Sequence, residues 1–172
     1  MRAPQNLGES ARGVKPFLAM GWMTQILYRG QRRLWKLLRP RTRGVKVMLF
    51  NGAGEILLVR NSYGATHLFV LPGGGVRPWE RPADAAEREI LEELGHRPEG
   101  LRPVSTHLAC AEGKRDTVYL FAASFAAAPR PDGREIAEAS FFRVDALPTN
   151  VSPATARRIA EWTGEAAADG RW

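Results

Sequence analysis

The sequence predicts an α/β fold of the α+β type, in which a mixed β-sheet lies between helices. Its 172 residues are about the size of a single domain. Its composition, with 44% hydrophobic and 25% charged residues, is close to that of globular proteins. The predicted elements are strands, one acidic helix, further strands and a terminal helix, an order that lacks the regular strand–helix alternation of a doubly wound sheet.

The first half of the domain is predicted to be a β-hairpin followed by a glycine-rich loop. Residues 45–50 and 55–59 are rich in aliphatic and β-branched side chains and flank an Asn51-Gly52 turn, which predicts a hairpin. After a loop at 61–67, residues 68–71 predict a short strand. The Pro-Gly-Gly-Gly sequence at 72–75 suits no regular element and predicts a loop.

The second half begins with a helix predicted over residues 82–94, with proline in its first turn and Gly95 just beyond its end. Residues 104–110 and 117–127 predict strands joined by a charged loop at 112–116, and residues 136–142 predict another strand. Ser152 and Pro153 predict the start of a last helix, which stops at Gly164. We expect residues 165–172 to be frayed.

The positive charge is confined to the N-terminal extension, placed at residues 1–43, before a domain at 44–163 and a tail at 164–172. Residues 1–44 hold ten Lys/Arg and one acid, a balance of +9, whereas residues 45–172 hold fifteen and seventeen, a balance of −2. Residues 22–39 predict a basic amphipathic helix. Its apolar side either contacts an anionic membrane surface or packs on the domain or on a second subunit in a homodimer. The nearly neutral body argues against nucleic acid as a partner.

The sequence predicts a cytoplasmic location, peripheral to a membrane if residues 22–39 bind one. The longest apolar stretch, residues 17–28, is shorter than the roughly 20 residues that span a bilayer, and it lacks a signal-peptide cleavage site. The single cysteine, Cys110, fits a reducing compartment.

Three glutamates share one face of the predicted helix over residues 82–94. Glu89, Glu92 and Glu93 lie within about 100° of arc, where like charges repel one another. The face is either a solvated acidic surface or a site for a hard divalent cation, Mg²⁺ or Mn²⁺, which prefers carboxylate oxygens. The glycine run before the helix favours the cation, since it lets the backbone approach metal and phosphates.

The spacing of these residues carries a resemblance to a known family. Gly74, Glu80 and the segment from Arg88 to Gly95 match the Nudix box, G-x5-E-x7-R-E-U-x-E-E-x-G-U with U apolar, at every position except the last. The chain therefore resembles the Nudix hydrolase family over about residues 44–163, with the box at 74–96. The departure is His96, which concerns the packing of the loop after the helix rather than the chemistry.

The resemblance implies a Nudix-like α/β/α sandwich and a reaction. The expected reaction is hydrolysis of the diphosphate linkage of a nucleoside diphosphate joined to another moiety, by attack of a metal-activated water. By position, the resemblance implies that Glu89, Glu92 and Glu93 are the catalytic and metal-binding carboxylates, and Glu89 is also a candidate general base.

The same resemblance implies roles for three further residues of the box. Arg88 is expected to act in catalysis by orienting the glutamates through charge-assisted hydrogen bonds, and Gly74 to offer its carbonyl to the metal. Glu80 is expected to have a supporting part.

Outside the box the sequence leaves alternatives open. Glu112, Asp116 and Glu135 are unranked candidates for a general base, and Arg60 either contacts substrate phosphates or is a solvated strand end. Selectivity is expected in the loops at 61–67, 112–116 and 129–135. His67, His107 and Cys110 have no partner in any motif and are expected to be structural.

Two other functions compete with the small-nucleotide hydrolase. One is a non-catalytic binding or regulatory module, against which the intact box argues. The other is an RNA 5′-end pyrophosphohydrolase, against which we count the lack of interleaved aromatic and basic residues in the body.

Overall fold

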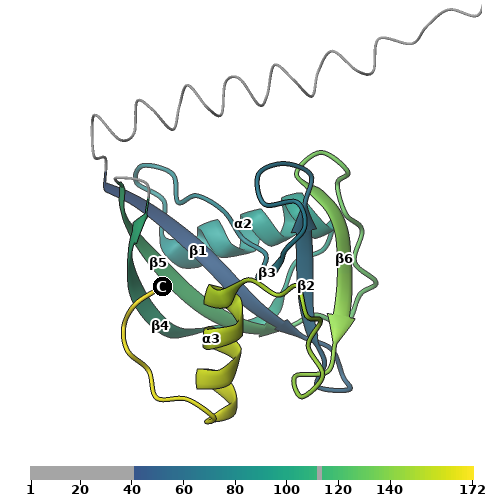
Figure 1. Cartoon of the computed structure of the whole chain (residues 1–172). Coiled ribbons are helices and arrows are strands. Elements are labelled where there is room, and N and C mark those ends of the chain that lie inside the picture. Colours follow the sequence, from purple (N-terminus) through teal and green to yellow (C-terminus); the bar gives the residue numbers. More distant parts are fainter. Residues whose placement is uncertain (1–40, 112–113) are drawn as a thin grey trace, which may run out of the picture.

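The computed structural model describes residues 41–111 and 114–172, in which six strands form one mixed sheet (Figure 1). The strand order is β3-β2-β1-β5-β4, and β6 pairs with β2. β1 runs parallel to β5, and the other pairs are antiparallel. The expected mixed sheet is confirmed, whereas the helix expected at 22–39 lies outside the described residues. The strands are β1 Arg41–Phe50, β2 Ile56–Asn61, β3 Phe69–Val70, β4 Glu99–Ala111, β5 Lys114–Ser124 and β6 Ile136–Phe142.

Two helices cover opposite faces of the sheet, α2 (Pro82–Leu94) behind it and α3 (Pro153–Thr163) in front of it in Figure 1. Side chains alternate along β1, so Val45, Val47 and Leu49 join the core cluster that contains Ile90 of α2. Met48 joins the cluster on the other face, which contains Ile159 of α3. This confirms the expected α/β/α sandwich.

Both helices have the expected ends because their boundary residues suit those positions. Pro82 opens α2, and Gly95 closes it with a φ of 77°. In α3 the Ser152 side chain accepts a hydrogen bond from the Thr155 N–H, and Gly164 has a φ of 82°. No helix within residues 41–111 and 114–172 is long and apolar enough to cross a membrane.

The hairpin between β1 and β2 is confirmed, but it is short. Only Leu49–Leu57 and Phe50–Ile56 pair across it. Beyond these pairs β2 separates from β1 and runs between β6 and β3. This divergence makes room for the loop at 72–75, whose Pro72 carbonyl accepts a hydrogen bond from the Val47 N–H of β1 at 3.0 Å.

Several strand ends differ from the sequence-based expectation. β1 begins at Arg41, ahead of the expected domain start at residue 44, because its first residues pair with β5. β4 begins at Glu99 instead of residue 104, with register shifts between Glu99 and Ser105 that include Pro103. β5 spans Lys114–Ser124 and not 117–127, so the expected loop at 112–116 is shorter. Pairing with a neighbouring strand, which local propensity does not report, determines where these strands begin and end.

The expectation that residues 165–172 are frayed is wrong. The Trp172 N–H donates to the Leu108 carbonyl and the Leu108 N–H donates to the Gly170 carbonyl, both at 3.2 Å, which adds the tail to the edge of β4. The Trp172 ring lies 5.8 Å from that of buried His107. The buried Arg158 also donates to the Arg171 carbonyl at 2.6 Å. The tail therefore covers a buried cation and supplies it with an acceptor.

Candidate active site

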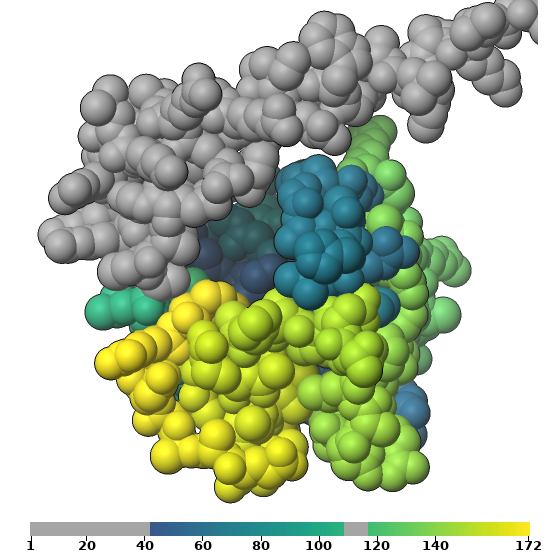
Figure 2. Space-filling view, viewed as in Figure 1, coloured from purple at the N-terminus to yellow at the C-terminus, as the bar shows by residue number. Residues whose placement is uncertain are grey.

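One cleft of about 810 Å³ contains Gly74, Arg88 and the three glutamates that were predicted on one face of α2. The cleft is bounded by the glycine loop at 72–75, one face of α2 and the loops around residues 61–63 and 132–135. Figure 2 shows the surface hollowed beside the loop that follows β2. Lining the cleft are Lys46, Asn61, Tyr63, Gly73, Gly74, Gly75, Arg77, Arg88, Glu89, Glu92, Glu93, Asp132, Arg134 and Glu135.

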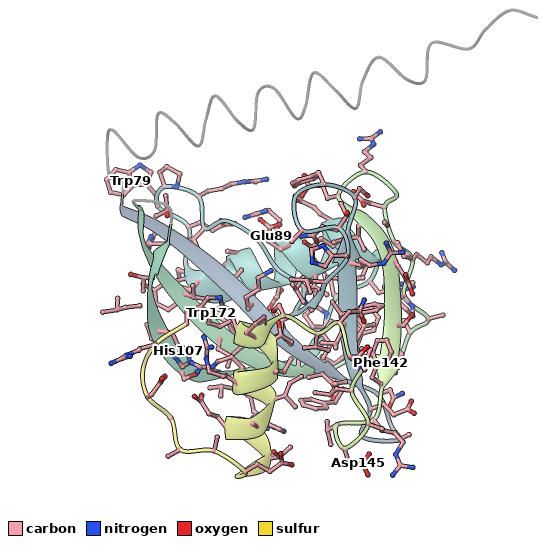
Figure 3. All side chains as sticks on the ribbon, viewed as in Figure 1. Trp79, Glu89, His107, Phe142, Asp145 and Trp172 are labelled. Carbon is pink, nitrogen blue, oxygen red and sulfur yellow. The ribbon has the colours of Figure 1, made fainter. Side chains whose placement is uncertain are left out.

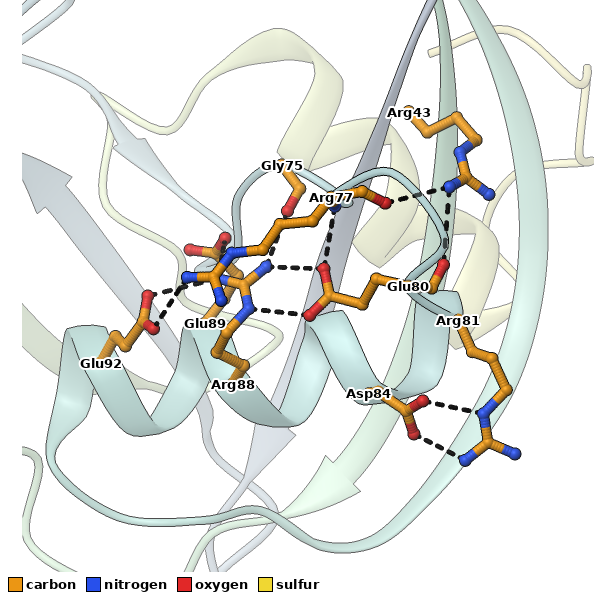
Figure 4. A network of polar contacts seen from close by, with 9 residues as sticks. All are labelled: Arg43, Gly75, Arg77, Glu80, Arg81, Asp84, Arg88, Glu89 and Glu92. Carbon is orange, nitrogen blue, oxygen red and sulfur yellow. Dashed lines mark hydrogen bonds and ion pairs between the residues drawn. The ribbon is translucent and has the colours of Figure 1, made fainter.

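Arg88 is the centre of the polar network on α2 (Figure 4). Its Nε and Nη2 donate to the two carboxylate oxygens of Glu80 at 2.8 and 2.9 Å. Its Nη1 donates to Glu89 at 2.7 Å and to Glu92 at 3.2 Å, and Nη2 also donates to the Gly75 carbonyl at 2.9 Å. One guanidinium thus orients three carboxylates and joins α2 to the glycine loop.

Glu80 lies beside the cleft and holds Arg88 from the side. The hydrogen bonds from Arg88 and, next, from the Arg77 N–H at 2.8 Å lower the pKa of Glu80 to about 2. Glu80 is therefore ionised throughout the physiological pH range and keeps the Arg88 guanidinium in place.

Glu93 is the most buried carboxyl of the box, with 7% of its surface exposed. Its side chain accepts a hydrogen bond from the Gly73 N–H at 2.9 Å. Burial raises the pKa of Glu93 to about 7 and the charge of Glu89 adds to the rise, while Lys46 and the Gly73 hydrogen bond oppose it. An ionised Glu93 therefore lacks full compensation of its charge in this structure.

Lys46 of β1 is a site residue that the sequence reasoning missed. Its Nζ donates to the Leu71 and Gly73 carbonyls, each at 2.8 Å, and so ties the glycine loop to the sheet. Burial lowers the pKa of Lys46, whereas the nearby charges of Glu93 and Glu89 raise it. A lysine inside the apolar run Val45 to Phe50 was the sequence signal that could have indicated it.

Gly74 lets the glycine loop approach the carboxylate of Glu89. A Cβ atom at Gly74 would lie 2.4 Å from Oε2 of Glu89, so any side chain there would displace it. The Gly74 carbonyl, expected to face a metal, accepts a hydrogen bond from the Val45 N–H at 2.9 Å. One of its two lone pairs is therefore already used.

The three box carboxylates do not converge on one point. Within residues 41–111 and 114–172, no group of three His, Cys, Asp or Glu side chains is placed to hold a metal ion. Glu89 and Glu92 are directed to Arg88, and Glu93 is directed to the Gly73 N–H. Exposed Glu92 also receives a hydrogen bond from Arg77 at 3.4 Å. Coordination of one ion by all three requires these side chains to rotate.

The loop at 129–135 is fixed to the C-terminal end of α2. The Asp132 N–H donates to the Glu93 carbonyl at 3.2 Å. The Asp132 side chain accepts from the N–H groups of Arg134, Glu135 and Ile136 at 2.9 to 3.1 Å, which closes the turn. These bonds place Arg134 and Glu135 in the cleft.

Of the three candidate bases outside the box, the structure brings Glu135 to the cleft. Glu112 and the side chain of Asp116 lie outside what the structure describes. The Tyr63 hydroxyl donates to the Glu135 carboxylate at 3.4 Å, so two loops meet at this side of the cleft. Asn61, Tyr63, Arg77 and Asp132 were not singled out from sequence, because only the fold brings them together.

The structure does not bring Arg60 to the box residues. Its Nε and Nη2 donate to Glu138 of β6 at 2.9 and 2.6 Å, and its Nη1 donates to the Thr66 carbonyl at 3.1 Å.

His96, the position at which the sequence departs from the box, packs edge-on against Phe125, with ring centroids 6.3 Å apart. An aromatic contact thus replaces the expected apolar one.

Comparison with known proteins gives a consistent picture. The model of the NUDIX domain family matches residues 40–163. An uncharacterized Nudix hydrolase of Pseudomonas aeruginosa is 35% identical over 105 residues, 59% of this chain and 62% of that protein. An RNA pyrophosphohydrolase of Bartonella bacilliformis is 35% identical over 65 residues, 34% of this chain and 38% of that protein. The chain thus spans less than two thirds of the length of these relatives.

Among solved structures, the fold is similar to the crystal structure of a MutT NUDIX hydrolase from Burkholderia pseudomallei. The TM-score is 0.63 and the sequence identity is 25%, over 69% of this chain and 95% of that one.

Proposed function

The chain belongs to the NUDIX domain family, and on that premise we propose that it is a metal-dependent pyrophosphohydrolase. Its proposed substrate is a nucleoside diphosphate joined to another moiety. The observation that carries this proposal is the lining of the cleft, which combines the three carboxylates of α2 with three arginines, Arg77, Arg88 and Arg134. Anionic phosphates and a cation both find oppositely charged partners there.

The donor chemistry of the cleft fits a hard divalent cation. Carboxylate oxygens of Glu89, Glu92 and Glu93 and the carbonyls of the glycine loop are the ligands that Mg²⁺ and Mn²⁺ prefer. Burial raises the pKa of Glu93 to about 7, so a cation bound beside it would stabilise its ionised form. When bound, the cation would neutralise charge on the phosphate oxygens and make water a better nucleophile.

The protein's own residues supply orientation and proton transfer. Water attacks one phosphorus, a new P–O bond forms, the P–O–P bridge breaks, and the other phosphate leaves. The proton released by water goes to a carboxylate, either Glu89 or Glu135, both of which line the cleft. Arg88 keeps Glu89 in place by a 2.7 Å hydrogen bond, while Arg77 and Arg134 are available to phosphate oxygens.

An RNA 5′-end pyrophosphohydrolase remains the second candidate. It is favoured by one observation, the name of the Bartonella bacilliformis relative that matches over 65 residues. A free nucleotide derivative is favoured by the shape of the cleft, which the loops at 61–63 and 132–135 border on one side. We place either activity in the cytoplasm, which fits the single cysteine of the chain.

A substrate panel tests the proposal. Nucleoside diphosphate sugars, dinucleoside polyphosphates, nucleotide coenzymes, oxidised nucleotides and a 5′-triphosphorylated RNA oligonucleotide are each incubated with Mg²⁺ or Mn²⁺, with EDTA as the control. The proposal expects cation-dependent cleavage of a nucleotide derivative into two phosphate-bearing products. Release of pyrophosphate from RNA alone selects the second candidate, and no cleavage of any substrate selects a non-catalytic module.

A further inference from the structure

Trp79 combines two unfavourable properties at one position. Among the described residues it is the one non-glycine residue in the left-handed region, with a φ of 67°. Its side chain is fully exposed, at 100%. An L-residue with a side chain in this conformation costs free energy relative to glycine, and an exposed indole forgoes the gain from burial. Such an outlier in a folded domain points to a functional contact outside the domain.

Arginines surround Trp79 on the loop that leads into α2. Trp79, Pro78, Arg43 and Glu80 line a shallow hollow. Arg81, next to Glu80, is 81% exposed. The acidic groups nearby are already paired, since Glu80 binds Arg88 and Asp84 binds Arg81.

Arg43 has the least compensated charge of this corner. Its guanidinium donates to the Arg77 and Glu80 carbonyls at 3.2 and 3.5 Å. Within the part of the chain that the structure describes, it forms no ion pair. Full positive charge therefore lies beside the exposed indole, a combination suited to an anionic, partly apolar surface.

The cationic extension joins the domain at this same corner. The Val76 N–H donates to the Arg43 carbonyl at 2.9 Å, which ties the Trp79 loop to the start of β1. Residues 1–40, which precede β1, carry eight Lys/Arg and one acid, a balance of +7. In Figure 3, Trp79 lies near the start of β1, while Asp145 lies at the opposite end of the molecule.

We propose that the Trp79 corner, comprising Arg43, Trp79 and Arg81, docks on an anionic lipid surface. An indole ring prefers the boundary between headgroups and acyl chains, and arginines are attracted by anionic headgroups. One aromatic side chain with a few cations binds weakly alone, and the charge of residues 1–40 provides the second attraction that stable anchoring needs.

Charge and composition favour lipid over two other occupants. A symmetric dimer through this corner would bring the same arginines of two copies together, which costs free energy. Single-stranded RNA is bound by successive aromatic platforms, whereas the other exposed aromatic side chain of the described residues, Tyr63, lines the cleft.

Trp79→Gly is the decisive variant, because glycine accepts the left-handed backbone and removes only the indole. We expect its melting temperature to equal or exceed that of the full-length wild type. Its partition coefficient onto vesicles of mixed phosphatidylcholine and phosphatidylglycerol should fall about tenfold in cosedimentation. Arg43→Gln should lower binding about fivefold. The matched control, Arg143→Gln at the distant end, should bind as the wild type does.

Three results would overturn the proposal. The first is that wild-type protein does not sediment with anionic vesicles at low salt, and the second is that Trp79→Gly sediments as wild type does. The third is that Trp79→Gly leaves vesicle binding intact but weakens binding of an RNA oligonucleotide or splits a dimer in sedimentation velocity, which identifies one of the other occupants. Binding that is lost in Trp79→Gly and absent on pure phosphatidylcholine supports the lipid surface.

Discussion

Gly74→Ala isolates the position of the Glu89 carboxylate from the stability of the fold. The new Cβ would lie 2.4 Å from Oε2 and 2.5 Å from Cδ of Glu89, whereas real Cβ contacts essentially never fall below 3.0 Å. The carboxylate must therefore move by at least 0.6 Å, the difference between 3.0 and 2.4 Å. It cannot keep its present position between Gly74 and Arg88.

We expect Gly74→Ala to lower kcat and to leave the stability of the fold nearly unchanged. The atoms that must move are the carboxylate atoms at the end of the flexible Glu89 side chain, and Gly74 has no left-handed φ. The free energy of unfolding should therefore change by less than about 1 kcal/mol. Misplacement of a catalytic group by about 1 Å costs up to about 10²-fold in rate. We expect kcat to fall between about tenfold and 10²-fold, measured on the best panel substrate with saturating Mg²⁺.

The neighbouring glycines provide matched controls. A Cβ at Gly75 meets nothing within 4 Å, so Gly75→Ala should keep both activity and stability. Gly73 has a φ of 122°, and its Cβ would lie 2.4 Å from the Val45 carbonyl oxygen, so Gly73→Ala should lose about 2–5 kcal/mol in urea unfolding. Full activity in Gly74→Ala, or an equal loss in Gly75→Ala, would refute this account of Glu89.

Three further outcomes are expected. Lys46→Met removes two hydrogen bonds to the glycine loop and should lower the free energy of unfolding by about 1–2 kcal/mol in urea, together with kcat; an unchanged urea midpoint would show that the loop needs no such tie. Burial and, next, the charge of Arg158 depress the pKa of His107 below 6.5, so its contribution to stability is present above pH 6.5 and declines as the pH falls through 6.5 toward the folded pKa. His107→Gln should therefore lose less stability than wild type between pH 7.5 and 5.5, and an equal loss would contradict this assignment. Mg²⁺ at millimolar concentration should raise the melting temperature, and Glu92→Gln should reduce the rise; curves unmoved by Mg²⁺ and Mn²⁺ would favour the solvated acidic face.

Local signals predicted the parts of the fold that local chemistry determines. The bounds of α2 follow from Pro82 and Gly95, and those of α3 from Ser152 and Gly164, because proline, glycine and serine have specific preferences at helix ends. The Asn51-Gly52 turn correctly predicted the hairpin.

Features that depend on distant partners could not be read from local patterns. The start of β4 contains Pro103, and the low β-propensity of proline argues against a strand there, yet pairing with β5 extends the strand to Glu99. The tail at 165–172 contains no predicted element, but it packs because Arg158 is buried beneath it and needs acceptors.

The candidate site divides in the same way. The box spacing placed Arg88 and three glutamates on one face of α2, since helical geometry alone determines that arrangement. Lys46 and Arg134 come from segments almost 90 residues apart in the chain and meet only through the sheet and the loop closed by Asp132. Arg60 was a candidate phosphate ligand by its position in the sequence, but in the structure it pairs with Glu138 of β6.

The turnover of Glu93→Gln in the presence of Mg²⁺ tests the central claim most directly. Glutamine nearly matches the shape of the buried Glu93 side chain but removes its charge, so kcat should fall by at least about 10²-fold with little change in unfolding free energy. The matched control is Glu87→Gln. Glu87 forms an ion pair with Arg97 at 3.0 Å, and neither residue lines the cleft, so this variant should retain wild-type kcat. Wild-type turnover by Glu93→Gln would contradict the assignment of this cleft as a metal-dependent active site.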